Sequence, residues 1–295
     1  MYTHFFDLDP DEKQGQALPL IYVWPVPYQG TVSFGYGTKD GPEAILKASY
    51  QIETYDARLD VDIEDLCHFI TLPFQRTNVA GPEYLYQDME NFLSRFDPKK
   101  DFLLTLGGEH SISFPLFKFY ARAFQDLVIL QIDAHADLRQ EYEGSRFSHA
   151  CIMARARDLG LRIVQIGIRS LCQEEAEYIK EHNGHDLLTF FAWELPDPLR
   201  TARLCREFIG HSPVYISFDV DGLDPAIMPG TGTPEPGGID YNWLNEFWFK
   251  FWPGPKLVGM DICELAPQPY NVVSESVAVK CIFNILTNYL KKQQE

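Results

Sequence analysis

Three short segments of this 295-residue chain carry side chains of the types that bind metal ions in proteins. They are GGEH at 107–110, DAHAD at 133–137 and DVD at 219–221. The candidate ligands are two histidines and four aspartates, namely His110, Asp133, His135, Asp137, Asp219 and Asp221. Four carboxylates gathered at one place repel one another, and their pKa values would rise unless cations neutralised them. Two divalent ions would supply that neutralisation, so the segments predict a two-metal site.

The ligand types narrow the choice of metal. Carboxylates outnumber imidazoles by four to two and the set contains no thiolate, which favours a harder ion than zinc. Manganese is the leading candidate, and iron, cobalt and nickel remain open. In a two-metal site Asp133 and Asp219 would each bridge the ions, and a water between them would lose a proton near neutral pH. The expected product is a hydroxide nucleophile.

Each segment follows a short apolar run, which indicates how the fold positions it. Runs of strand length alternate with segments of helical period, the pattern of a mostly parallel sheet covered by helices. Strands are expected at 20–24, 51–55, 102–106, 127–132, 162–167, 187–191, 214–218 and 257–263, and helices at 42–49, 83–95, 113–124, 149–159, 173–181, 198–209, 241–251 and 274–291. We therefore expect an α/β fold with a single three-layer α/β/α domain over residues 1–295. Ligands of such sheets bind outside the carboxyl ends of the strands, where all three segments lie.

Composition and charge exclude several classes of partner. The formal net charge is −17, and such a surface repels nucleic-acid phosphates and anionic lipid, so neither nucleic acid nor a membrane is an expected partner. The acidity serves either solubility or the attraction of a cationic substrate, and both explanations remain open. The six cysteines show no CxxC spacing and the N-terminus lacks the features of a signal peptide. A reduced, cytoplasmic protein is expected.

Four motifs together carry a family resemblance. GGEHS, DAHAD, SFDVDGLDP and MDICELAP resemble the signature blocks of the ureohydrolase family, the arginases and agmatinases, and the resemblance runs from near position 25 to the last helix. It implies a three-layer α/β/α domain, two Mn²⁺ ions per chain, hydrolysis of a guanidino group to urea and an amine, and assembly into homotrimers or homohexamers.

The resemblance also implies roles for individual residues. His110 and Asp137 would hold one manganese and His135 and Asp221 the other, with Asp133 and Asp219 bridging. Glu264, in CELAP, would face the guanidinium, whose planar fork suits a carboxylate. His149, in RFSHAC, would shuttle a proton to the departing amine. The implied catalytic residues are thus His149, Glu264 and Asp221.

The substrate is less closely defined than the reaction. The stretch from Asp137 to His149 resembles the agmatinase branch, which implies cleavage of agmatine to putrescine and urea, a step of polyamine biosynthesis. Glu141 and Glu143 are the expected partners of the substrate amine, although Arg139 or Arg146 could receive a carboxylate instead. Arginine, guanidinobutyrate and formiminoglutamate remain alternative substrates, and a non-catalytic metal-binding homologue is a further alternative.

Two long connections, 25–41 and 223–238, are of a length usually found in functional loops. The first departs from the family pattern at two positions. Gln29 stands where many agmatinases have aspartate, and Lys39 stands where the family usually has arginine. The sequence assigns no role to either residue.

Overall fold

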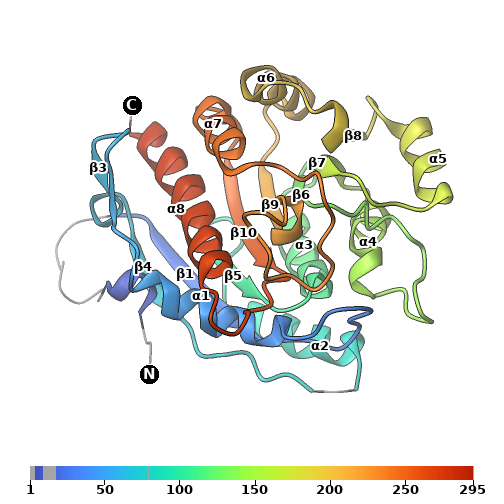
Figure 1. Cartoon of the computed structure of the whole chain (residues 1–295), viewed down its shortest axis with the longest axis horizontal. Coiled ribbons are helices and arrows are strands. Elements are labelled where there is room, and N and C mark those ends of the chain that lie inside the picture. The colour runs from blue at the N-terminus through green and yellow to red at the C-terminus, as the bar shows by residue number, and fades with distance from the viewer. Residues whose placement is uncertain (1–3, 9–17, 79, 295) are drawn as a thin grey trace.

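A computed structural model describes residues 4–8, 18–78 and 80–294, and these residues are built around one central sheet (Figure 1). All seven pairings in this sheet are parallel, which confirms the predicted α/β class. In spatial order the eight strands are β4 (His68–Thr71), β1 (Leu20–Val26), β5 (Phe102–Gly107), β10 (Leu257–Cys263), β9 (Val214–Asp219), β6 (Val128–Ile132), β7 (Arg162–Ile168) and β8 (Leu187–Phe191).

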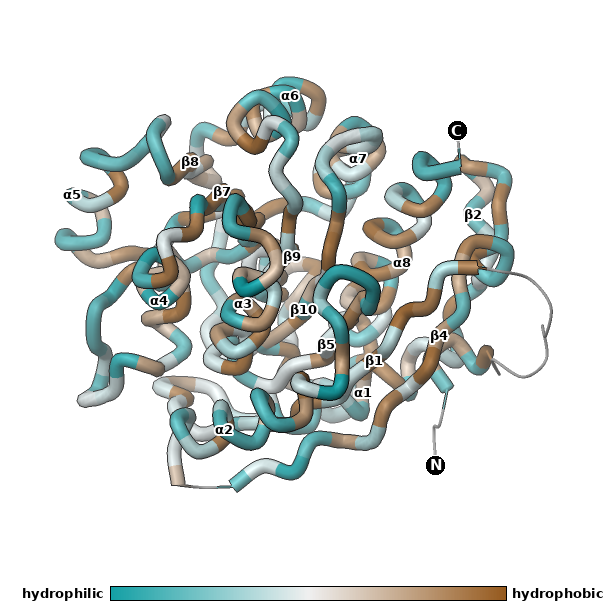
Figure 2. Tube along the Cα trace, turned by 180° about the vertical axis from the view of Figure 1, so that it is seen from behind, coloured by the Kyte–Doolittle hydropathy of each residue, from teal (hydrophilic) through white to brown (hydrophobic). Residues whose placement is uncertain are grey.

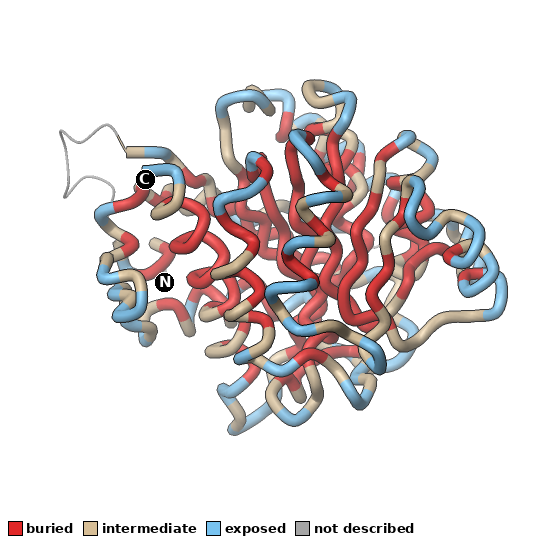
Figure 3. Tube along the Cα trace, turned by 90° about the horizontal axis from the view of Figure 1, so that it is seen from above, coloured by how far each residue is buried: buried red, intermediate tan, exposed pale blue. Residues whose placement is uncertain are grey.

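Helices cover both faces of the sheet, which gives the expected three layers (Figures 1 and 3). One apolar cluster joins the first face to α1 (Gly41–Ser49), α6 (Pro198–Ile209), α7 (Tyr241–Phe251) and α8 (Val273–Gln293). A second cluster joins the opposite face to α2 (Pro82–Leu93), α3 (Ser113–Ala121), α4 (Ile152–Asp158) and α5 (Gln173–His182). Because both faces are covered, every residue of β6 and β9 is buried.

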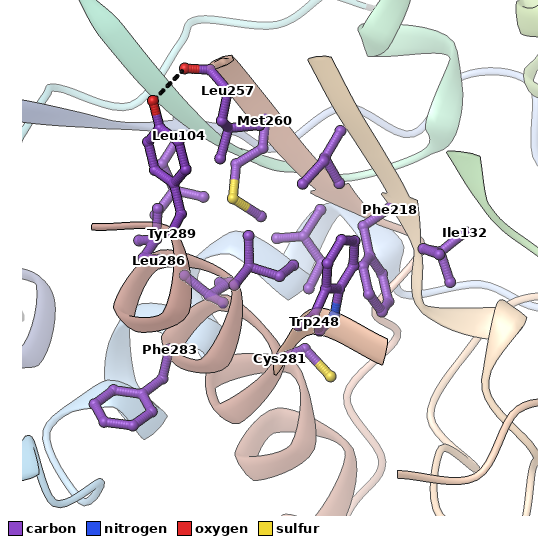
Figure 4. Close-up of a cluster of buried hydrophobic side chains, with 14 of the residues drawn as sticks. Leu104, Ile132, Phe218, Trp248, Leu257, Met260, Cys281, Phe283, Leu286 and Tyr289 are labelled. Carbon is purple, nitrogen blue, oxygen red and sulfur yellow. Dashed lines mark hydrogen bonds between the residues drawn. The ribbon is translucent and has the colours of Figure 1, made fainter. Parts of the chain in front are cut away.

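The first cluster contains more buried residues than the second. Figure 4 shows part of it, in which Met260, Phe218 and Leu104 from three strands meet Trp248 of α7 and Leu286 of α8. Figure 2 shows that hydrophilic residues lie on the outside of the molecule, as in the largely hydrophilic helix α5. Among the described residues, none of the helices combines the length and the apolarity needed to cross a bilayer.

The predicted strand at 51–55 is wrong. Backbone bonds from Gln51 to Ala48 and from Ile52 to Ser49 instead close the end of α1. Tyr55 enters only a two-stranded antiparallel ribbon of β2 (Tyr55–Asp56) and β3 (Val61–Asp62). The eighth strand of the central sheet is β4, a short edge strand that the sequence analysis missed.

Four helices begin at other residues than predicted: α1, α2 and α8 begin one residue earlier, and α4 begins later. The predicted helix at 149–159 begins as a 3₁₀ turn, η5 (His149–Cys151), before α4. Ser274 lies inside the first turn of α8, and its hydroxyl accepts a bond from Gly230 N (2.8 Å) and so holds the loop 223–238. A bond from Gly35 N to Gly232 O (3.0 Å) joins the two long loops to each other.

Candidate metal centre and substrate cavity

The three ligand segments meet at the carboxyl edge of the sheet. β5, β9 and β6 lie within four neighbouring strands, and each ends where one segment begins. The chain turns after β5 into η4 (His110–Ile112) and after β9 into η7 (Val220–Gly222). In the second turn, Asp219 Oδ1 accepts a bond from Asp221 N (2.9 Å), which fixes both aspartates at this edge.

His110 faces three carboxylates with a buried ring nitrogen that makes no hydrogen bond. Its Nδ1 lies 3.2 Å from Asp133 Oδ2, 3.0 Å from Asp137 Oδ2 and 3.6 Å from Asp219 Oδ2. The other nitrogen, Nε2, lies 2.9 Å from Ser217 Oγ. Because the Ser217 hydroxyl donates to Asp261 Oδ1 (3.1 Å), its oxygen accepts from His110 Nε2. The ring is therefore oriented with Nδ1 toward the carboxylates.

His135 stands on the other side of Asp133. Its Nδ1 lies 3.0 Å from Asp221 Oδ2 and 3.6 Å from Asp133 Oδ1. Asp133, which is fully buried, therefore presents one oxygen to each histidine. A carboxylate placed in this way is suited to bridge two ions.

The buried carboxylates of the centre stabilise positive charge placed between them, as the pKa values of the ligand candidates show. Burial and the charges of Asp221 and Asp133 raise the pKa of Asp219 well above its ordinary value, and burial and Asp133 raise the pKa of Asp137 to about 7. Burial works against protonation of His135, but Asp221 and Asp133 raise its pKa to about 12. The pKa of His110 is likewise raised, against the effect of burial, by Asp133 and Asp137. Divalent cations would neutralise these carboxylates and make protonation of the ligand candidates unnecessary.

The donor set fits a pair of metal ions. In the described part of the chain, two groups of ligand atoms share Asp133: one adds His110 and Asp219, and the other adds His135 and Asp221. Asp137 joins the first group through its contact with His110. Oxygen donors predominate over nitrogen, which suits manganese and other ions of similar hardness. The unbonded Nδ1 of His110 is the position that most clearly lacks a cation partner.

Glu264 follows β10 and is tied to the first ligand segment. Its Oε1 accepts a bond from His110 N (2.7 Å), and its own N–H donates to Gly108 O (2.7 Å). Burial and the charge of Glu109 raise the pKa of Glu264 to about 8. Glu264 and Asp137 both adopt positive φ angles, 66° and 53°, which are uncommon for residues other than glycine and cluster at functional sites.

His149 is held by the first long loop. Its backbone N–H and its Nδ1 each lie 3.2 Å from Thr31 Oγ1. The Thr31 hydroxyl in turn donates to Glu109 Oε1 (2.7 Å), and Glu109 Oε2 accepts from Thr31 N (2.7 Å). The loop comes this close because residue 108 is glycine; a Cβ there would lie 1.9 Å from Tyr28 O.

A cavity of about 250 Å³ opens beside the metal centre. Among the predicted site residues it reaches His135, Asp137 and His149, and its other lining residues are Ser33, Ala136, Arg139, Tyr142, Ala150, Ser170, Leu171, Glu175 and Thr233. Glu264 does not line it either, but its bond to His110 N keeps it at the ligand segments. Glu141 and Glu143 are exposed and have neither contact, so the structure does not bring these two residues to the site.

Glu175 is the acidic wall residue that the sequence analysis missed. It lies in the first turn of α5, is buried, and accepts bonds from Leu138 N (2.9 Å) and Cys172 N (2.8 Å). Ser170 closely follows β7, much as the ligand segments follow their strands, but Glu175 lies in the next helix, so the sequence carried no comparable signal for it.

Gln29, which stands where many agmatinases have aspartate, makes hydrogen bonds within its own loop. Its Oε1 accepts bonds from Gly37 N (2.8 Å) and from the Thr38 hydroxyl (3.4 Å), so it closes the first long loop on itself. Lys39 is exposed.

The chain is similar to known hydrolases over nearly its whole length. It is 35% identical to N(1)-aminopropylagmatine ureohydrolase of Synechocystis, covering 98% of this chain and 95% of that one, and 33% identical to agmatinase of Bacillus subtilis, covering 96% and 94%. Proclavaminate amidino hydrolase of Streptomyces clavuligerus superposes with a TM-score of 0.87 at 27% identity, over 98% of this chain and 97% of that one. A profile of the Arginase family matches residues 20–287. This chain belongs to the arginase family of hydrolases.

Proposed function

We propose that this enzyme is a two-manganese hydrolase that cleaves agmatine to urea and putrescine. The observation that carries the proposal is the buried Asp133 carboxylate, which offers Oδ2 to His110 and Oδ1 to His135. A shared carboxylate of this kind supports two ions held side by side. One ion would lie with His110 and Asp137 and the other with His135 and Asp221, with Asp133 and Asp219 shared.

When bound, two divalent cations supply Lewis-acid chemistry, which makes water acidic enough to act as a nucleophile near neutral pH. Of the ligands, Asp221 is proposed as a catalytic residue as well. Its Oδ2 is set toward His135 by a bond from the Thr233 hydroxyl (3.0 Å), and its Oδ1 is held by Ala134 N (3.1 Å).

Glu264 is proposed to bind the guanidinium. A cation beside it would favour the ionised carboxylate over the neutral form that burial favours. Because Oε1 is committed to His110 N, the other oxygen remains for a charge-assisted bond to the substrate. The same bond to His110 sets the guanidinium at a fixed place relative to the metal ligands.

His149 is proposed to protonate the departing amine. Thr31 has one hydroxyl proton, which goes to Glu109, so Thr31 can only accept from the His149 ring. In this arrangement the ring proton is held at Nδ1, where Ser148 Oγ (3.4 Å) is a second acceptor, and Nε2 is the atom left to exchange a proton with the substrate. Burial lowers the pKa of His149, with the charge of Glu109 acting in the opposite direction, so the neutral ring is favoured near pH 7. Nε2 would therefore first accept a proton from the attacking water and then pass it to the departing amine.

Replacement of Thr31 tests this orientation. Thr31→Val removes the hydroxyl but keeps the shape, and we expect kcat to fall roughly tenfold to a hundredfold because the imidazole is no longer held in place. Metal content should be unchanged and Thr31→Ser should restore most of the rate. Steady-state kinetics over a range of pH with metal analysis provides the measurement. Equal losses in the valine and serine variants would show that the hydroxyl does not orient the ring.

The cavity wall supports a cationic substrate tail. Glu175 contributes negative charge to this wall, and the Arg139 side chain lies 3.8 Å from the Glu175 carboxylate and 5.2 Å from the centre of the Tyr142 ring. Arg139 is thus partly neutralised and is a weaker receptor for a substrate carboxylate than a free arginine would be. Aminopropylagmatine is the second candidate, because the Synechocystis relative named for it aligns over 98% of this chain.

A substrate panel decides between these candidates. Protein loaded with Mn²⁺ should release urea with the highest kcat/KM from agmatine or aminopropylagmatine, with arginine and guanidinobutyrate at least tenfold behind because their carboxylates would enter an acidic cavity unpaired. Formiminoglutamate should be inert. Faster cleavage of arginine would reject the substrate assignment, and no cleavage of any compound would favour a non-catalytic homologue.

Assembly into homotrimers or homohexamers and a cytoplasmic location stay predictions. Light scattering of the purified protein would measure the number of chains per particle.

A further inference from the structure

A row of buried polar side chains crosses the sheet directly beneath the metal centre. Six adjacent strands each contribute one residue, and the strand registers place these residues side by side: Thr105, Asp261, Ser217, Gln131, Gln165 and Thr189. All six are at most 6% exposed. Asp133 and Asp219 lie two residues after Gln131 and Ser217, so they stand on the same face of the sheet one step closer to the carboxyl edge.

The half of this row that runs from Gln131 to Thr189 is a chain of hydrogen bonds that ends on Asp133. The Thr189 hydroxyl donates to Gln165 Oε1 (2.9 Å), and Gln165 Nε2 donates to Gln131 Oε1 (2.7 Å). Gln131 Nε2 donates to Asp133 Oδ2 (2.7 Å). Each bond runs in the same direction, from β8 through β7 to β6.

The direction of this chain is fixed because every amide hydrogen in it has an acceptor. The second Nε2 hydrogen of Gln165 goes to Ala136 O (2.8 Å), and the second of Gln131 goes to His135 O (3.2 Å). Turning the Gln131 amide over would place its oxygen against Asp133 and His135 O and its N–H against that of Gln165. Turning the Gln165 amide over would place its oxygen against Gln131 Oε1 and Ala136 O. The Gln131 amide must therefore present a donor to Asp133.

Asp133 Oδ2, which accepts the bond from Gln131 Nε2, is also the oxygen that faces His110. Asp133 Oδ2 lies 3.2 Å from His110 Nδ1, and Oδ1 is held by His135 N (2.6 Å). With one bond on each oxygen, the carboxylate cannot rotate about its bond to the chain. Hydrogen bonds of this kind to metal ligands commonly raise metal affinity and activity 10-fold to 100-fold.

We propose that Gln131, aligned by Gln165 and Thr189, is a positioning residue that holds Asp133 with one oxygen toward each histidine. The inference rests on the metal role of Asp133 in the proposed function but not on the substrate. The same strand positions that form the interior of the sheet thus prepare the shared ligand before an ion arrives.

Metal titration of the purified full-length protein tests the proposal without any substrate. In Gln131→Met, which removes the donor and keeps the length, Mn²⁺ affinity measured by calorimetry should fall on the order of 10-fold to 100-fold. The exposed Gln173→Met in α5 is the matched control and should bind as the parent does. Circular dichroism should show an unchanged fold for both metal-free variants.

A double-variant cycle separates positioning from general loosening of the core. Thr189→Val should weaken Mn²⁺ binding in the parent but cause no further loss in Gln131→Met, because Thr189 acts only through the amide chain. Parental affinity in Gln131→Met, or equal effects of Thr189→Val in both backgrounds, would overturn the proposal. If Gln131→Met does not fold, Thr189→Val alone decides, with unchanged affinity overturning it. A parent that binds two ions but cleaves no guanidine would refute the proposed reaction, and the affinities would still decide the role of Gln131.

Discussion

Asp133→Ala is expected to abolish binding of both metal ions and to lower kcat by a factor on the order of a thousand or more. The reason is that Asp133 offers an oxygen to each histidine, so its loss removes a ligand from both metal positions and leaves the remaining carboxylates to repel one another. Elemental analysis of protein dialysed against a weak chelator and urea release measure the two effects.

The matched control for this variant is Asp126→Ala. Asp126 is exposed and precedes β6, so its removal changes the net charge by the same amount and should leave metal content and rate as in the parent. Retention of one tightly bound ion with full activity in Asp133→Ala would show that the carboxylate is not shared. In that case the enzyme would work with a single metal.

Glu264→Gln is expected to lower kcat/KM roughly tenfold to a few hundredfold while both metals stay bound. Loss of a charge-assisted bond to the guanidinium costs about 1.5–3 kcal/mol. The substitution keeps the side-chain oxygen that accepts from His110 N, so the ligand segment should remain in place. The measurement is a kinetic comparison at saturating Mn²⁺ with metal content determined on the same sample.

Glu235→Gln serves as the comparison variant for this effect. Glu235 lies in the loop 223–238 and accepts a bond from the Ser170 hydroxyl (3.1 Å), so it is an acidic residue beside the cavity wall but outside the proposed guanidinium contact. Its kcat/KM should change much less than that of Glu264→Gln. If Glu264→Gln instead emptied a metal position, Glu264 would be a ligand or would hold one, and its assignment to the substrate would be wrong.

The ligand cluster was accessible from sequence because its signal is local. Each segment directly follows an apolar strand, and the parallel strands carry their ends to one edge, so a one-dimensional pattern predicted the meeting of His110, Asp133 and Asp219. The cavity wall was not accessible in this way. Glu141 and Glu143 are close to the ligands in sequence but point to solvent, whereas Glu175 reaches the cavity from the first turn of another helix.

The polar row beneath the site escaped notice for a different reason. In each strand a single polar residue interrupts an apolar run, as Gln131 does in VILQI and Ser217 in VYISF. A single such residue has no evident meaning. Only the register between strands, which sequence does not supply, places them side by side. β4 was missed for another reason: an edge strand of four residues shows little apolar pattern.

The place of β10 in the sheet bears on how the protein is made. Among the described strands β10 comes last in the sequence, yet it lies between β5 and β9. No strand on one side of β10 pairs with a strand on the other side in the described sheet. Until β10 inserts, β4, β1 and β5 form one half-sheet and β9, β6, β7 and β8 another. His110 belongs to the first half and the remaining five ligand candidates to the second. Metal capture at both positions is therefore expected only after the residues of β10 have left the ribosome, when the central strand joins the two halves.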